Sequence, residues 1–123
     1  MLKEHDKIRI VLADDHEVVR AGLRRLLSID RNIEIIDEAE NGKRAVELVL
    51  KHQPDIALLD IMMPVMTGIE ATKEIKASSC LSYVVMLTAF EDSMHLEKAI
   101  AAGADGYLSK DICKRLSGSI AFS

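Results

Sequence analysis

The segment "IALLDIMMP" (residues 56–64) runs from four apolar residues into an aspartate, and a proline follows four residues later. An uninterrupted apolar run of this kind is typical of a parallel strand that is covered on both faces. A carboxylate at the end of such a strand is costly to bury unless a cation or a hydrogen-bond donor pairs with it. Asp60 is therefore either a solvated turn residue or the centre of a site.

Apolar runs and amphipathic segments alternate along the chain on both sides of this segment. The predicted strands are residues 8–15, 33–39, 55–61, 83–89 and 106–110, and the predicted helices are residues 16–29, 43–52, 69–78, 92–103 and 111–123. Strict alternation with short loops indicates right-handed strand–helix–strand units around one parallel sheet. We therefore expect an α/β fold, a doubly wound five-stranded parallel sheet with helices on both faces.

Three local features of these helices can be tested directly. The first helix is expected to begin at Asp15 or His16, with Asp15 as a candidate N-cap and His16 as a helix-start residue. In the second helix, Leu50 is expected to face inward together with the alanine and valines before it. The segment 112–123 is a doubtful or irregular last helix, because Gly118 in a helix interior costs about 1 kcal/mol relative to alanine.

Length and composition indicate one globular domain that spans residues 1–123. The net charge of −4 argues against nucleic acid binding by the chain itself, because neutralising phosphates needs a basic face. The sequence contains no secretory signal pattern and no long uncharged apolar run, so no membrane association is expected. The two cysteines, Cys80 and Cys113, fit no metal-ligand spacing and are expected to be reduced thiols of a cytoplasmic protein.

Polar side chains follow the predicted strands, and the carboxyl ends of parallel strands are where such sheets bind ligands. Strands one, three, four and five are followed by five candidate site residues: Asp14, Asp15, Asp60, Thr88 and Lys110. Each of them alone has an ordinary interpretation as a cap, a strand end or a surface charge. The second strand offers only Glu38 and Glu40, which are expected to be solvated, as is the basic strip of Arg20, Arg24 and Arg25 on the first helix.

Taken together, the five residues predict phosphoryl chemistry beside a metal. Carboxylates that lie close together repel one another and favour a bound cation, and oxygen ligands suit Mg²⁺. A lysine and a threonine beside them can hold a phosphoryl group, and a carboxylate such as Asp60 can be the nucleophile that forms an aspartyl phosphate. No glycine-rich loop of the Walker type is present in the sequence to cradle a nucleotide.

Four motifs carry a resemblance to a known family: "LADDHEVVRAGLRRLL", "DIALLDIMMPVMTGIE", "MLTAF" and "GADGYLSKD". In this order they resemble the receiver domains of two-component response regulators, of the subfamily that is usually joined to a helix-turn-helix DNA-binding domain. The resemblance covers about residues 8–111. It implies a flavodoxin-like receiver fold with strand order 2-1-3-4-5.

The resemblance also implies a function and a set of roles. Asp60 would accept a phosphoryl group from a sensor histidine kinase, with Lys110 and Thr88 beside it. Mg²⁺ would be bound by the side chains of Asp15 and Asp60, by the backbone carbonyl of Met62, and by Asp14 through water. Thr88 and Tyr107 would form the switch that changes the face of the fourth helix, fifth strand and fifth helix, and so controls an output, with transcription as the expected one.

The sequence also leads to expectations about partners and about the rest of the protein. No DNA-binding output domain is expected within the chain, and the chain is either an excised domain or a complete protein. The arginine strip on the first helix could also be where the kinase docks. A homodimer that forms on phosphorylation is another expected partner state.

Two alternative functions remain beside the signalling switch, whose only expected catalysis is its own phosphorylation and dephosphorylation. The first is a Mg²⁺-dependent phosphohydrolase that also uses an aspartyl phosphate. Such enzymes usually carry a second acid two residues after the nucleophile to protonate the leaving group, and here that position is Met62. The second is a receiver-like interaction module without phosphorylation.

Overall fold

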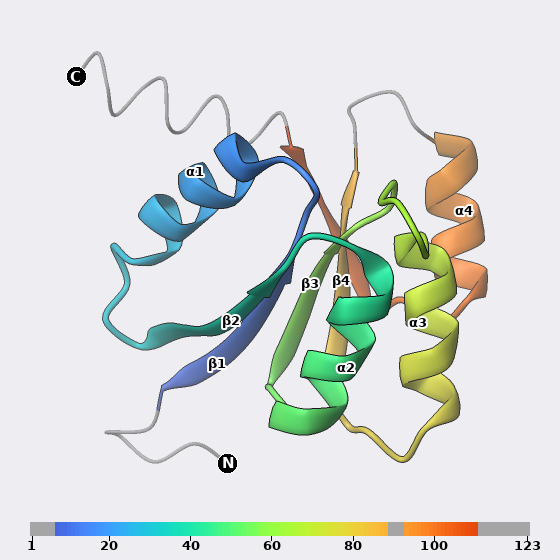
Figure 1. Ribbon diagram of the computed structural model, residues 1–123, viewed down its shortest axis with the longest axis horizontal. Coiled ribbons are helices and arrows are strands. Elements are labelled where there is room, and N and C mark those ends of the chain that lie inside the picture. Colours follow the sequence, from blue (N-terminus) through green and yellow to red (C-terminus); the bar gives the residue numbers. More distant parts are fainter. Residues whose placement is uncertain (1–6, 89–92, 111–123) are drawn as a thin grey trace.

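The computed structural model describes residues 7–88 and 93–110 (Figure 1). In this part of the chain, strands and helices alternate strictly. The elements are β1 (Ile8–Ala13), α1 (Glu17–Leu27), β2 (Ile33–Ala39), α2 (Gly42–His52), β3 (Ile56–Asp60), α3 (Gly68–Ala77), β4 (Tyr83–Thr88), α4 (Ser93–Ala101) and β5 (Gly106–Ser109). The predicted last helix, residues 111–123, lies outside the described residues.

The strands form one parallel sheet in the order β2-β1-β3-β4-β5, as predicted. Helix α1 covers one face of the sheet, and α2, α3 and α4 cover the other (Figure 1). The fold is therefore the expected doubly wound α/β architecture of the flavodoxin-like receiver type. None of the described helices combines the length and the apolar character needed to cross a bilayer.

Strand β3 is apolar up to its last residue, Asp60, because each of its faces meets a different part of the core. Ala57 and Leu59 belong to the apolar cluster under α2, α3 and α4, whereas Leu58 belongs to the cluster that contains Leu23 of α1. All three strand residues are at most 3% exposed. Full burial of a leucine side chain contributes about 1.5–3 kcal/mol, so both clusters hold β3 at the centre of the sheet.

Helix α2 is rotated relative to the prediction. Leu50, expected to face inward, is 40% exposed, and Leu48 is completely buried instead. The helix packs on α3 as well as on the sheet, so its buried side is the row that contains Ala45, Leu48 and Val49. A second helix neighbour cannot be read from the periodicity of α2 alone, which explains the error.

An ion pair between Lys76 and Asp105 lies next to the edge strand β5. The Asp105 carboxylate accepts hydrogen bonds from Lys76 Nζ at 2.6 Å and from the Val84 amide at 2.8 Å. Lys76 also donates to the Ser82 carbonyl oxygen at 3.3 Å. Burial alone would raise the pKa of Asp105, but the bonds from Lys76 and Val84 outweigh it and lower this pKa. The contact therefore joins α3, β4 and the turn before β5.

Replacing Asp105 with asparagine should lower the free energy of unfolding by about 1–2 kcal/mol at neutral pH, because a charge-assisted bond to Lys76 is lost. The pKa of Asp105 is lowered from 3.8, so its contribution is present above that value and is lost as pH falls through the lower folded pKa. The difference between wild type and variant should shrink as the pH falls below 3.8, in urea unfolding at a series of pH values.

The surface pair Arg44–Glu47 provides the control, because both side chains are more than half exposed. Glu47→Gln should change the free energy of unfolding by less than about 0.5 kcal/mol. Equal effects of the two substitutions would contradict a special role for the Lys76–Asp105 contact.

Candidate functional site

Asp60 is the last residue of β3 and is only 3% exposed. The chain leaves the strand and comes back to it at Gly68, whose amide donates to the Ile61 carbonyl oxygen at 2.8 Å. A Cβ atom at Gly68 would lie 2.1 Å from the Asp60 carbonyl oxygen, so only glycine permits this approach. The loop after β3 is therefore closed tightly over the end of the strand.

The same loop is also held from the side by α2. The Gly42 amide donates to the Met66 carbonyl oxygen at 3.1 Å, and a Cβ atom at Gly42 would lie 2.1 Å from that oxygen. Between these contacts Val65 adopts a left-handed backbone conformation with φ 69°, inside a three-residue turn closed by Met66 N–H and Pro64 C=O at 2.7 Å. A β-branched residue rarely adopts this conformation, so the surrounding contacts determine the path of the loop.

The acid pair follows β1. Asp14 is completely buried, whereas the Asp15 side chain is 31% exposed. His16 is the N-cap of α1 and its side chain makes no capping hydrogen bond, so the prediction of a helix-start residue is confirmed for His16 and the prediction of an N-cap is wrong for Asp15. The reason is that the Asp14 carboxylate already accepts the His16 amide at 2.8 Å, which places the start of the helix one residue later.

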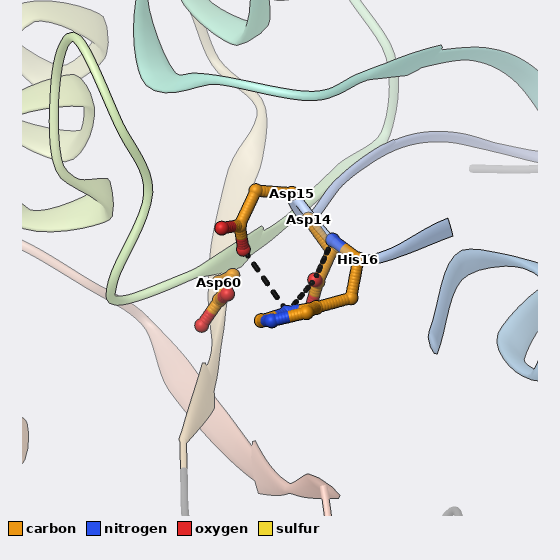
Figure 2. A group of neighbouring side chains, drawn as sticks. All are labelled: Asp14, Asp15, His16 and Asp60. Carbon is orange, nitrogen blue, oxygen red and sulfur yellow. Dashed lines mark hydrogen bonds and ion pairs between the residues drawn. The ribbon is translucent and has the colours of Figure 1, made fainter. Parts of the chain in front are cut away.

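The three aspartates converge with a histidine at the carboxyl edge of the sheet (Figure 2). One possible ligand atom from each of Asp14, Asp15, His16 and Asp60 lies within 4.8 Å of all the others. The His16 Nδ1 atom lies 3.2 Å from Asp14 Oδ1 and 3.1 Å from Asp15 Oδ1. The convergence of the acids was predicted, but this double contact of the histidine ring was not.

Lys110 follows β5 and reaches into the acid cluster. Its Nζ atom lies 2.9 Å from Asp14 Oδ2 and 3.0 Å from Asp60 Oδ2. Both carboxylate oxygens are buried, and in the described part of the chain neither has a partner in well-aligned hydrogen-bond geometry, so the contacts with Lys110 are ion pairs. Burial alone would lower the pKa of Lys110, but the two carboxylates outweigh it and raise this pKa. One ammonium therefore serves two buried carboxylates.

Because Lys110 is shared with Asp14, it only partly neutralises the charge of Asp60. Burial raises the pKa of Asp60 to about 6, the contact with Lys110 opposes the rise, and the nearby Asp14 adds to it. The Met62 amide donates weakly to Asp60 Oδ1 at 3.3 Å. A carboxyl group in this environment gains from any further cation that approaches it.

The remaining predicted residues lie along the same edge. Thr88 is the last residue of β4 and is 5% exposed. In the sheet register, Leu87 lies beside Asp60 of β3, and Thr88 lies beside Ser109 of β5, the residue before Lys110. Tyr107 pairs with Met86, two residues before Thr88, so Thr88 and Tyr107 project from the same face of the sheet. Tyr107 and Met62 are 55% and 52% exposed. The roles predicted for these residues stay predictions.

The donor set fits a hard divalent cation. The cluster contributes three carboxylates, and two of their oxygens are buried without a well-aligned hydrogen bond among the described residues. Oxygen ligands of this kind bind Mg²⁺ or Ca²⁺ in proteins, and a site with few protein ligands suits Mg²⁺. The aspartate cluster could therefore hold a metal ion.

Two residues that were expected to be solvated are not. Glu38 and Arg20 are 24% and 16% exposed at their side chains, and Arg20 Nε donates to Glu38 Oε1 at 3.2 Å. Arg24 donates to both Glu38 carboxylate oxygens at 2.7 Å. Glu40 and Arg25 are exposed as predicted. The ion pair between Arg20 and Glu38 could not be predicted from the sequence, because the pairing depends on how α1 packs against β2.

Comparison with known proteins adds an independent finding. A family model described as the response regulator receiver domain matches residues 10–116. The chain is 42% identical to the chemotaxis protein CheY of Halobacterium salinarum, over 86% of this chain and 87% of that protein. It is 44% identical to the transcriptional regulatory protein LnrK of Bacillus subtilis, over 85% of this chain but only 48% of that protein, so it spans about half of that relative. Among solved structures, the signal receiver domain of the response regulator NarL from Mycobacterium tuberculosis superimposes with a TM-score of 0.83 at 35% identity and covers 86% of both chains.

Replacing Asp60 with asparagine should raise the free energy of unfolding in metal-free buffer at neutral pH, by about 1–2 kcal/mol. The folded pKa of Asp60 is raised from 3.8 to about 6, so its contribution to stability is fully present below 3.8 and is lost as pH rises through about 6. The gain in the variant should therefore be largest at neutral pH and shrink toward pH 3.8. Urea unfolding with a chelator present measures it, and a variant that is less stable at neutral pH would contradict the assignment.

Proposed function

The chain belongs to the response regulator receiver domain family, and we propose that it is a signalling switch that accepts a phosphoryl group on Asp60 from a sensor histidine kinase, with Mg²⁺ as its cofactor. The single observation that supports this most strongly is the arrangement around Asp60, a buried carboxylate that shares Lys110 with Asp14. Both the cation and the phosphoryl group fit the chemistry of that edge.

In the proposed transfer, a carboxylate oxygen of Asp60 forms a bond to phosphorus while the bond between phosphorus and the donor nitrogen breaks. The electron pair of that bond stays on the imidazole of the kinase histidine. Asp15 and Asp60 would hold Mg²⁺ by their side chains, Met62 by its carbonyl and Asp14 through water. The bound ion would supply charge neutralisation for the phosphoryl oxygens.

Lys110 and Thr88 act on the phosphoryl group itself. The Lys110 ammonium already lies 3.0 Å from the attacking carboxylate, so it can pair with a phosphoryl oxygen without a large movement. Thr88 ends the neighbouring strand and can donate its hydroxyl hydrogen to another phosphoryl oxygen. Movement of Thr88 toward the phosphoryl group would make room for Tyr107, which lies on the same face and is exposed before the change.

The output belongs to the same proposal. The face built on α4 and β5 would carry the change to a partner or output domain that regulates transcription, because one relative is itself a transcriptional regulatory protein. The single domain would remain in the cytoplasm, catalyse only its own phosphorylation and dephosphorylation, and form any homodimer in the phosphorylated state. The pairing of Asp60 with Lys110 would then be the inactive state of the switch.

Incubation with Mg²⁺ and the small phosphodonor acetyl phosphate should attach one phosphoryl group to the wild type, as measured by intact-mass spectrometry. Asp60→Asn should remain unmodified, because the nucleophile is lost. Asp55→Asn is the matched control, because Asp55 directly precedes the opposite end of β3 and its carboxylate accepts a hydrogen bond from the Arg9 amide. This variant should be modified like the wild type. Beryllofluoride, a phosphoryl mimic, should shift the amide NMR signals of Thr88 and Tyr107 in the wild type and in Asp55→Asn, but not in Asp60→Asn.

Two results would contradict the proposal in different ways. Sustained hydrolysis of small phosphate esters by the wild type would identify a phosphohydrolase. A wild type that takes up neither the phosphoryl group nor beryllofluoride would be an interaction module without phosphorylation.

A further inference from the structure

Arg20 connects the candidate metal site to the edge strand β2. Its Nη1 atom donates to the Asp14 carbonyl oxygen at 2.5 Å, and its Nε atom donates to Glu38 Oε1 at 3.2 Å. The side chain is only 16% exposed, although arginine is usually solvated. One guanidinium therefore holds the backbone between the two acids on one side and a carboxylate of β2 on the other.

The contact with Asp14 is made to the peptide group that leads to the next side chain, Asp15. The Asp14 carbonyl is part of the peptide that joins Asp14 to Asp15, and rotation of this peptide turns the Asp15 side chain toward or away from Asp60. The Asp14 amide is already held by the Ala39 carbonyl oxygen at 3.1 Å. With Arg20 on the carbonyl, the backbone on both sides of Asp14 is fixed to β2 and α1.

The position of Arg20 in its own helix is unfavourable. It lies in the first turn of α1, where the helix dipole favours an acid rather than a base. Arg24, one turn later, already pairs with both oxygens of Glu38. The contact that only Arg20 makes is the one with the Asp14 carbonyl, so this contact distinguishes the two arginines.

We propose that Arg20 is a positioning residue for the metal site: by holding the Asp14–Asp15 peptide against Glu38, it keeps the Asp15 carboxylate directed at Asp60. The inference rests on the proposed function, in which these two carboxylates bind Mg²⁺. Arg20 touches neither the metal nor the phosphoryl group and acts only through the backbone of the acid pair.

Simple electrostatics predicts the opposite effect, which makes the proposal testable. Arg20 is a cation close to a cation site, so its removal should strengthen Mg²⁺ binding if only charge mattered. If Arg20 positions Asp15, its removal should weaken binding, because loss of groups that orient metal ligands typically lowers metal affinity about 10–100-fold.

The experiment measures Mg²⁺ affinity by isothermal titration calorimetry for the wild type, Arg20→Met and Arg24→Met. Methionine keeps an apolar stem of similar reach and removes charge and donors. Arg20→Met should raise the Kd for Mg²⁺ about tenfold, and the matched control Arg24→Met, which loses the same Glu38 partner, should stay within about twofold. At saturating Mg²⁺, phosphorylation of Arg20→Met by acetyl phosphate should proceed at a rate close to that of the wild type, an effect that general loss of structure would not produce.

A second route avoids dependence on one variant. Glu38→Gln should weaken Mg²⁺ binding in the wild type but have no further effect in Arg20→Met, because Glu38 acts through Arg20. Unchanged or tighter Mg²⁺ binding by Arg20→Met, or equal losses in Arg20→Met and Arg24→Met, would overturn the proposal while leaving the proposed function intact. A wild type that binds no Mg²⁺ would overturn the proposed function itself.

Discussion

Two buried carboxylates, Asp14 and Asp60, share the single ammonium of Lys110, and this shortage of positive charge governs the candidate site. Desolvation disfavours the charged form of Asp60, and repulsion from Asp14 adds to the cost. The sheet tolerates the arrangement because the apolar clusters on its two faces hold β1 and β3 at its centre. The stability of the apolar core therefore offsets the cost of burying these carboxylates at the carboxyl edge of the sheet. A further cation that bound there would reduce this cost.

Close packing also constrains the backbone conformation around Asp60. Gly42 and Gly68 permit close backbone contacts with the Met66 and Asp60 carbonyl oxygens that a side chain would block, and Val65 takes a backbone conformation that is rare for its type. These features close the loop after β3 onto α2 and onto the end of its own strand. The position of Met62 thus follows from contacts made several residues away, which suits a loop that would offer a backbone carbonyl to a metal.

The sequence predicted what depends on local pattern and topology. The strand order and the meeting of Asp14, Asp60 and Lys110 follow once the segments alternate, because parallel strands bring their carboxyl ends to one edge. The predictions from the sequence were wrong where a residue's burial or pairing depends on packing between distant segments. Leu50 turns outward because α2 also contacts α3, and Glu38 is paired because α1 lies over β2. The ring of His16 meets both acids because the helix starts one residue later than Asp15 alone suggested.

The charge balance at the site also couples the two ligands of the proposed switch, the phosphoryl group and the divalent cation. Phosphorylation of Asp60 would replace the one negative charge of its carboxylate with the about one and a half to two negative charges of a phosphoryl group. Among the described residues, this happens where two buried carboxylates already share one ammonium. In the proposed switch, the phosphorylated form would therefore bind a divalent cation more tightly than the free form. By thermodynamic reciprocity, the cation would stabilise the phosphorylated form by the same factor. Arg20, which donates to the Asp14 carbonyl oxygen, would then influence the phosphorylation equilibrium through the orientation of the acids, without touching the phosphoryl group.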